Sequence, residues 1–67
     1  LDVILLKEKI HRVMASLVPQ YRRMLFLKYF EGVSVEDIAE KFAITFKSAE
    51  SKLFRARKAF VEAFLSI

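Results

Sequence analysis

The sequence has no cysteine, one proline and one glycine. Without cysteine there is neither a disulfide framework nor a thiolate metal site, which excludes zinc fingers and fits the reducing cytoplasm. Because turn-forming residues are this rare and 55% of the chain is hydrophobic, a disordered or loop-rich protein is also excluded. The longest apolar runs, Val3–Leu6 and Met24–Leu27, are far shorter than the ~20 residues of a membrane span. We therefore expect no membrane segment.

The chain is small and basic. Its 67 residues suffice for one domain with one hydrophobic core. Since the first residue is leucine rather than methionine, we expect a piece of a longer polypeptide or a processed product. Twelve lysines and arginines against eight aspartates and glutamates give a formal charge of +4, which by itself favours a polyanionic partner only weakly. The distribution is more informative, because five bases lie within residues 47–58: Lys47, Lys52, Arg55, Arg57 and Lys58.

The first half of the chain predicts two helices. Residues 3–17 carry apolar side chains at three- and four-residue steps, which is one face of a helix. That face consists of Val3, Leu6, Ile10, Val13, Met14 and Leu17. A second helix is predicted from Pro19 to Phe30, because proline is tolerated in a first helical turn and the pair Glu31-Gly32 stops the helix.

The second half predicts a short helix and a long one. Ser34 is a suitable N-cap, and Asp37 three residues later favours the positive end of a helix of about two turns. The apolar stripe of this helix is Val35, Ile38, Ala39 and Phe42. Thr45 is a second N-cap, and nothing interrupts a helix from residue 46 to about 65. We therefore predict a small all-α domain of four helices, with a helix-turn-helix over residues 34–58.

The long helix has an apolar side and a basic side. At ~100° per residue, one arc collects the apolar residues Phe46, Ala49, Leu53, Ala56, Phe60 and Phe64. The adjoining arc collects Glu50, Phe54, Lys47, Ser51, Arg55, Ser48, Lys52 and Lys58. We expect the first arc in the core. The second arc is expected in solvent, where it is basic, rich in hydroxyl groups and carries one aromatic ring.

Such a basic face suits the major groove of DNA, which admits one helix and presents donors, acceptors and the thymine methyl group. The side chains that can bond base edges or phosphates are Lys52, Arg55, Ser48 and Ser51. Glu50 can accept from a cytosine amine, and Phe54 can contact a thymine methyl. Phosphate contacts are also expected from Lys47 and Lys58 and, at helix N-termini where free N–H groups attract anions, from Ser34 and Thr45.

Each of these features also has a simpler interpretation. A basic helix face is most often only a solvated face. Phe54, which lies off the core arc, is more often a contact for another helix or for a partner. Ser34 and Thr45 are sufficiently explained by capping. On these residues alone, DNA binding is one of several open interpretations.

Catalysis and metal binding have no support in the sequence. His11 is the only histidine and has no cluster of acidic residues around it, so we assign it no function. The acids Glu36, Asp37 and Glu40 stand in the first turns of a short helix, where the helix dipole already favours them. There is no nucleophile-base pair and no glycine-rich phosphate loop. We therefore expect no enzyme activity and no cofactor.

Three segments resemble one known family. Residues 18–32, which read VPQYRRMLFLKYFEG, are similar to the opening of region 4 of sigma-70-family factors. Residues 34–42 resemble the first helix of that family's helix-turn-helix. Residues 48–58, which contain the signature Leu-Phe-Arg-Ala-Arg, resemble its recognition helix. The resemblance covers nearly all of residues 17–60 and is closest to the compact extracytoplasmic-function group.

The resemblance implies a domain that binds the −35 promoter element as part of bacterial RNA polymerase, in the cytoplasm. It also implies that an apolar face holds the flap-tip helix of the polymerase β subunit, and it makes an anti-sigma factor a further candidate partner. In such factors, the positions that face the major groove match Glu50, Ser51, Lys52, Phe54 and Arg55. The helical wheel selects the same arc independently.

The chain departs from the family's pattern at two positions. Ala43 stands where the family commonly has glycine in the turn, and an alanine there costs about 1 kcal/mol if the residue adopts a positive φ. Glu50 stands where many members have lysine or arginine. We interpret this glutamate as an altered base preference rather than a loss of binding.

Two other functions remain open. A response-regulator-type helix-turn-helix transcription factor has the same capped helices and a similar long last helix, and it would bind a palindrome as a dimer. A protein-interaction module is suggested by more large apolar residues than one small core can cover. These residues are Leu1, Ile4, Leu5, Phe26, Phe54, Val61 and Leu65. In a sigma factor the same residues would contact the polymerase or an anti-sigma factor.

Overall fold

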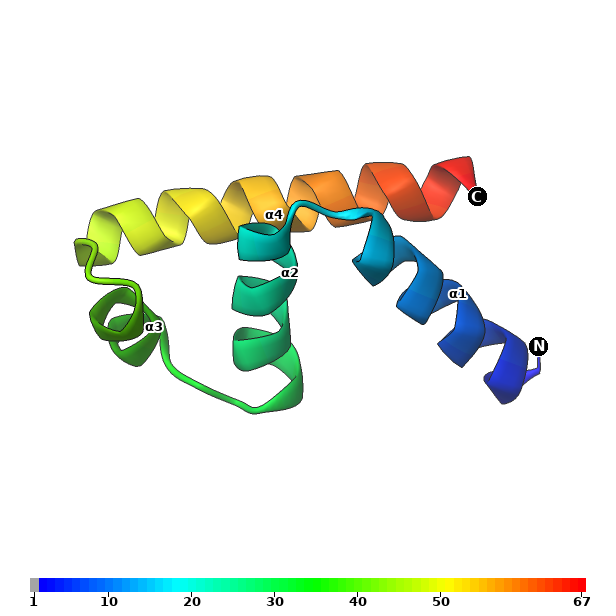
Figure 1. Cartoon of the computed structure of the whole chain (residues 1–67), viewed down its shortest axis with the longest axis horizontal. Helices are drawn as coiled ribbons and strands as arrows, with labels where there is room; N and C mark the ends of the chain where they lie inside the picture. Colours follow the sequence, from blue (N-terminus) through cyan, green and yellow to red (C-terminus); the bar gives the residue numbers. More distant parts are fainter. Residues whose placement is uncertain (1) are drawn as a thin grey trace.

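A computed structural model describes residues 2–67, and this part of the chain forms helices joined by short connections. The elements are α1 (Val3–Ser16), α2 (Pro19–Leu25), the π-helical turn η1 (Phe26–Phe30), α3 (Val35–Lys41) and α4 (Phe46–Ser66). The helix α4 runs the length of the molecule, and the other helices lie along one side of it (Figure 1). The predicted all-α domain with four helices and a helix-turn-helix is confirmed.

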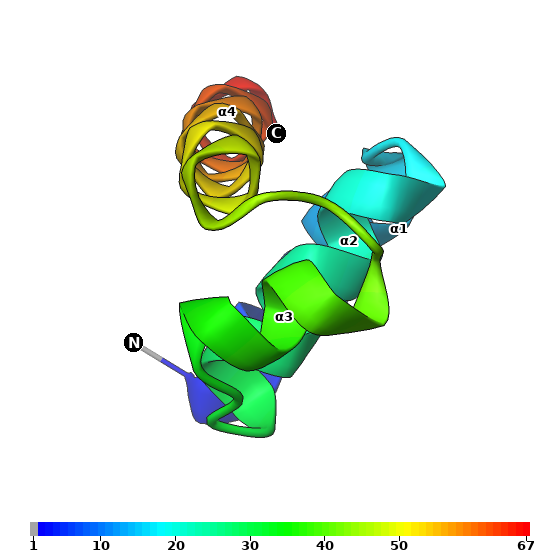
Figure 2. The same ribbon diagram turned by 90° about the vertical axis from the view of Figure 1, so that its left-hand side faces the viewer.

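The three shorter helices meet α4 at different points along its length. The helix α3 packs against the N-terminal end of α4, α2 against its middle, and α1 against its C-terminal half (Figure 1). Viewed along α4, all three lie below it on the same side (Figure 2). One long helix therefore connects two ends of the molecule that are built from different partners.

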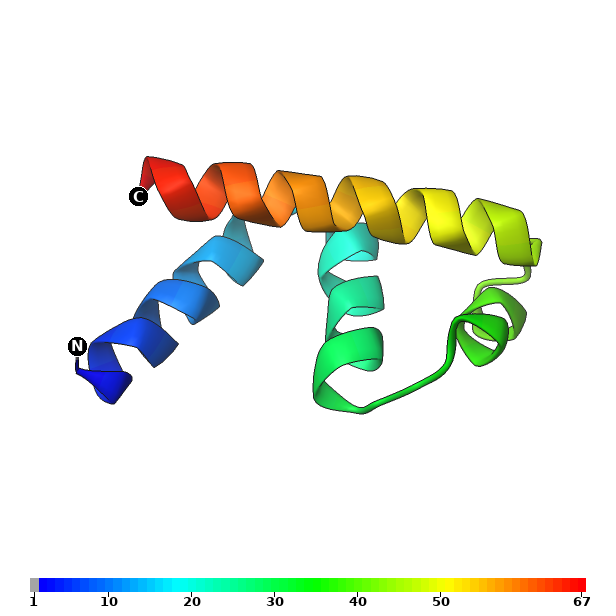
Figure 3. The same cartoon turned by 180° about the vertical axis from the view of Figure 1, so that it is seen from behind.

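The helix α1 begins as predicted but is covered only in part. The Asp2 carboxylate accepts a hydrogen bond from the Ile4 N–H at 2.9 Å and so caps the helix. Val13 and Leu17 are buried, whereas Val3, which the sequence predicts on the same face, is 63% exposed. The predicted face is covered only in part because α1 diverges from α4 toward its N-terminus, so no helix covers its first turns (Figure 3).

The second predicted helix changes from α-helical to π-helical hydrogen bonding in its last turn. From Phe26 to Phe30 the backbone is π-helical, and the Glu31 N–H donates to the Phe26 carbonyl at 3.1 Å. Gly32 ends the helix at φ 69°, and a Cβ there would meet no atom within 4 Å. Glycine is therefore favoured here for its backbone angle and not for space. The sequence predicts the end of this helix but not its π turn.

The core forms two clusters. The first, here called the helix-turn-helix cluster, consists of Met24, Ile38, Ala39, Ala49 and Leu53, all buried. The second, here called the α1 cluster, consists of Leu17, Leu25 and Ala56. The apolar stripe of α3 and most of the core arc of α4 are thus confirmed. Of the remaining three residues of that arc, Phe60 and Phe64 are half-buried and Phe46 is 47% exposed, so the prediction for Phe46 is wrong. It starts α4 one turn before Ala49, the first buried position of that helix.

The turn between α3 and α4 has the hydrogen bonds of a Schellman motif. The Ala43 N–H donates to the Glu40 carbonyl at 3.1 Å, and the Ile44 N–H donates to the Ala39 carbonyl at 3.0 Å. Ala43 has a φ of 55°, the left-handed conformation that glycine adopts most easily. Because φ is positive, alanine at this position carries the expected cost of about 1 kcal/mol relative to glycine. Ile44 packs against the helix-turn-helix cluster and holds the turn closed.

Candidate nucleic-acid interface

The solvent side of α4 contains most of the residues that the sequence predicts for DNA contact. Lys47, Glu50, Ser51, Phe54, Arg55 and Lys58 are exposed. Ser48 and Lys52 are half-buried on one flank. Ala49, Leu53 and Ala56 are buried on the opposite side, so the wheel separates core from surface apart from Phe46 and the two half-buried residues. The two half-buried side chains lie against the protein, which restricts where their polar ends can reach.

Both predicted N-caps are present. The Thr45 hydroxyl accepts a hydrogen bond from the Ser48 N–H at 3.0 Å, and the Ser34 hydroxyl accepts one from the Asp37 N–H at 3.1 Å. These bonds fix where α3 and α4 begin, and thereby the direction in which α4 leaves the turn. Ser34 and Thr45 are both exposed, so their remaining lone pairs and the free N–H groups of the first turns face solvent.

The exposed face of α4 is electropositive and chemically mixed. Between residues 46 and 61 the helix carries five bases and a single carboxylate, Glu50. Phe54 is 62% exposed, so a full aromatic ring stands among the charged side chains. This combination can neutralise phosphates, exchange hydrogen bonds with base edges and contact a methyl group on one helix surface.

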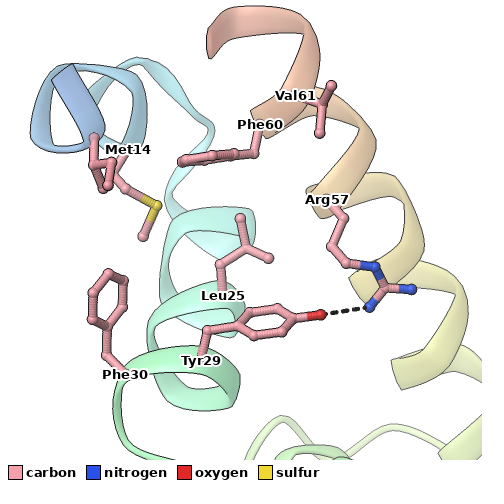
Figure 4. A pocket seen from close by; sticks show the side chains of 8 residues that line it. Met14, Leu25, Tyr29, Phe30, Arg57, Phe60 and Val61 are labelled. Atoms are coloured by element: carbon pink, nitrogen blue, oxygen red, sulfur yellow. Dashed lines mark hydrogen bonds between the residues drawn. The ribbon is translucent and has the colours of Figure 1, made fainter. Parts of the chain in front are cut away.

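Arg57 belongs to the same basic run but lies elsewhere. Its guanidinium donates a hydrogen bond to the Tyr29 hydroxyl at 3.1 Å, which ties α4 to the π turn (Figure 4). Residues two apart on a helix point about 200° apart, so Arg57 and Arg55 face different surroundings. Tyr29 received no role from the sequence, because nothing local connects it to a residue so distant in the chain.

Arg57 borders an apolar cavity of about 370 Å³ between α1, the α2–η1 segment and α4 (Figure 4). Its other lining residues are Ile10, Met14, Leu25, Tyr29, Phe30, Phe60 and Val61. A second cavity of about 660 Å³ lies between α1 and the α2–η1 segment and shares Ile10, Met14 and Phe30 with the first. The sequence contains one indication of this apolar surface, namely that it has more large apolar residues than a small core can cover. Six of the seven named for it are exposed, and Leu1 lies outside the described residues.

The remaining candidates form no site within residues 2–67. His11 is exposed and lines the second cavity, and Glu36, Asp37 and Glu40 are exposed on α3. In this part of the chain, no three His, Cys, Asp or Glu side chains gather as metal ligands. None of the described helices combines the length and hydropathy that crossing a membrane requires.

Comparison with known families gives one match. The family model described as Sigma-70, region 4 matches residues 7–60, which include all of α2, η1 and α3 and most of α1 and α4. No curated protein and no solved structure matches the chain significantly. The match covers well over half of the 67 residues and includes the helix-turn-helix together with the helices that support it. The chain therefore belongs to the sigma-70 region 4 family, non-enzymatic DNA-binding domains through which sigma factors take part in promoter recognition by RNA polymerase.

Proposed function

We propose that this domain binds the −35 promoter element as part of a bacterial sigma factor of the extracytoplasmic-function group, acting in the cytoplasm. The observation that carries the proposal is the exposed face of α4, which is basic and held at a fixed angle by the helix-turn-helix cluster beneath it. A helix supported in this way fits the major groove with its N-terminal turns toward the base edges.

The proposed contacts fall into two groups. Arg55, Lys52, Ser48 and Ser51 bond base edges, Glu50 accepts from a cytosine amine, and Phe54 contacts a thymine methyl. The groups that hold the phosphates are Lys47 and Lys58 together with the capped helix ends at Ser34 and Thr45. The exposure of all these side chains except Ser48 and Lys52, which are half-buried at the edge of the same face, supports this assignment.

We propose that the polymerase binds the apolar surface at the α1 end of the molecule. The cavity between α1, η1 and α4 can accept the apolar side chains of the β flap-tip helix. An anti-sigma factor that covered the same surface would compete with the polymerase. The exposed Phe26, Phe30 and Val61 beside the cavities support a protein contact here, because a monomer in water leaves few such clusters uncovered.

Selection of duplexes from a random pool tests the proposal that this domain binds a specific DNA sequence. The affinity of the Lys52→Ala and Glu50→Arg variants for the selected sequence is then measured. Both changes are expected to alter base preference, and Lys52→Ala should weaken the selected site by about 1–3 kcal/mol if it contacts a base. Lys7→Ala is the matched control, since Lys7 is exposed on α1. Uniform weakening on all sequences would make Lys52 a phosphate contact. Failure of the pool to yield any preferred sequence would contradict the proposal.

A further inference from the structure

Two arginines of α4 that are two residues apart are both exposed but point toward different surroundings. Arg55 is exposed on the basic face. Arg57 donates to the Tyr29 hydroxyl at 3.1 Å and borders the apolar cavity of about 370 Å³. The hydrogen bond reaches across the fold to a residue 28 positions away in the chain, so it orients the arginine toward η1 and away from the basic face.

The cavity beside Arg57 is suited to an apolar side chain. Its walls are aliphatic and aromatic, and among residues 2–67 Arg57 is the one charged residue that lines it. A nucleic-acid phosphate would find no other donor there than Arg57 and the hydroxyl of Tyr29. The neighbouring cavity, which shares Met14 and Phe30 with the first, also has charged lining residues of one sign, Lys7 and Arg22. An apolar floor with basic edges is complementary to an amphipathic helix with acidic flanks.

We infer that Arg57 selects the protein partner rather than the promoter, by pairing with a carboxylate next to an apolar side chain that enters the cavity. The inference rests on the proposed docking of a protein at this surface and specifies the chemistry of its partner, an acidic amphipathic helix. Tyr29 is the positioning residue, because its hydroxyl holds a long, flexible side chain in place before the partner arrives. The paired carboxylate and guanidinium form a charge-assisted bond at the edge of an apolar contact.

Two fluorescein-labelled helical peptides test the inference. Both carry leucines along one face, and they differ only in the residues that flank the central leucine, glutamates in one and lysines in the other. The domain is expected to bind the glutamate peptide about tenfold more tightly than the lysine peptide. Arg57→Gln should remove this preference. Tyr29→Phe, which deletes only the hydroxyl group, should reduce it about threefold while both peptides still bind.

Duplex binding is measured on the same variants. Arg57→Gln should weaken duplex binding no more than Arg12→Gln, which removes an exposed charge from α1, whereas Arg55→Gln should weaken it about tenfold. A loss of duplex binding by Arg57→Gln equal to that of Arg55→Gln would overturn the inference. So would absence of binding by the glutamate peptide or equal binding of both peptides. If no variant or wild-type protein prefers any duplex while the peptide results hold, the promoter proposal fails and the inference about Arg57 stands.

Discussion

The two ends of this domain differ in how completely their apolar side chains are buried. At the α3 end, the helix-turn-helix cluster is complete, and α4 presents charged and hydroxyl groups to solvent together with the rings of Phe46 and Phe54. At the α1 end, the smaller α1 cluster leaves cavities and a row of exposed apolar side chains. These are Val3, Ile4, Leu5, Phe26, Tyr29, Phe30, Val61 and Leu65. In the proposed function, the α3 end contacts the polyanion, whereas a protein partner covers the apolar side chains of the α1 end.

The largest expected effect is on the free energy of unfolding, and it tests whether the helix-turn-helix cluster contributes most of that free energy. Leu53 is 1% exposed, so Leu53→Ala should cost about 2–5 kcal/mol, enough to unfold much of a domain this small. Leu65→Ala is the control, because Leu65 is 78% exposed and its loss should change stability by less than about 0.5 kcal/mol. Urea unfolding followed by circular dichroism measures both. Equal costs for the two substitutions would remove the distinction between the two ends.

A second prediction concerns the charged surface. Arg55→Ala should weaken binding to the selected duplex by about 1–3 kcal/mol and relax the preference for one base pair. The free energy of unfolding of this variant should hardly change, because Arg55 is exposed. Arg12→Ala serves as the control for loss of one positive charge. Fluorescence anisotropy with the selected and a scrambled duplex gives the comparison, and an effect of the same size on both duplexes would reassign Arg55 to a phosphate.

The two left-handed residues give a third, smaller pair of effects. Ala43→Gly should stabilise the domain by about 1 kcal/mol, since it relieves the strain of a side chain at φ 55°. Gly32→Ala should destabilise it by about the same amount for the same reason, because the space around Gly32 is open and only the backbone angle opposes a methyl group. Thermal unfolding of both variants checks the signs. Destabilisation by Ala43→Gly would show that the turn is held by something other than its backbone angle.

The smallest effect is on the salt dependence of binding. If Lys58 contacts a phosphate, Lys58→Ala should lower the slope of log affinity against log salt by about 1 and leave base preference intact. Lys7→Ala, at the apolar end, should leave the slope unchanged. Titrations of one duplex over a range of salt concentrations measure this. A change in slope with Lys7→Ala would mean that DNA also contacts the α1 end.

Local signals in the sequence predict much of this structure. Ser34 and Thr45 mark the starts of α3 and α4 because the capping bond is made within three residues. The face of α4 follows from helical periodicity. The prediction of burial is wrong at Phe46, because burial depends on whether another helix covers that turn. The bond between Tyr29 and Arg57 was unpredictable for a similar reason, since it depends on how α2, η1 and α4 cross.

The unbroken course of α4 has a consequence for how the two ends work together. The helix has 21 residues, about 31 Å at the standard rise, and it carries both the basic face and the edge of the apolar cavity. In the proposed function, no hinge separates the promoter contact from the partner contact. The distance between them and their rotation about the helix axis are then fixed by backbone geometry, so the domain specifies the phase at which the promoter element is presented to the polymerase.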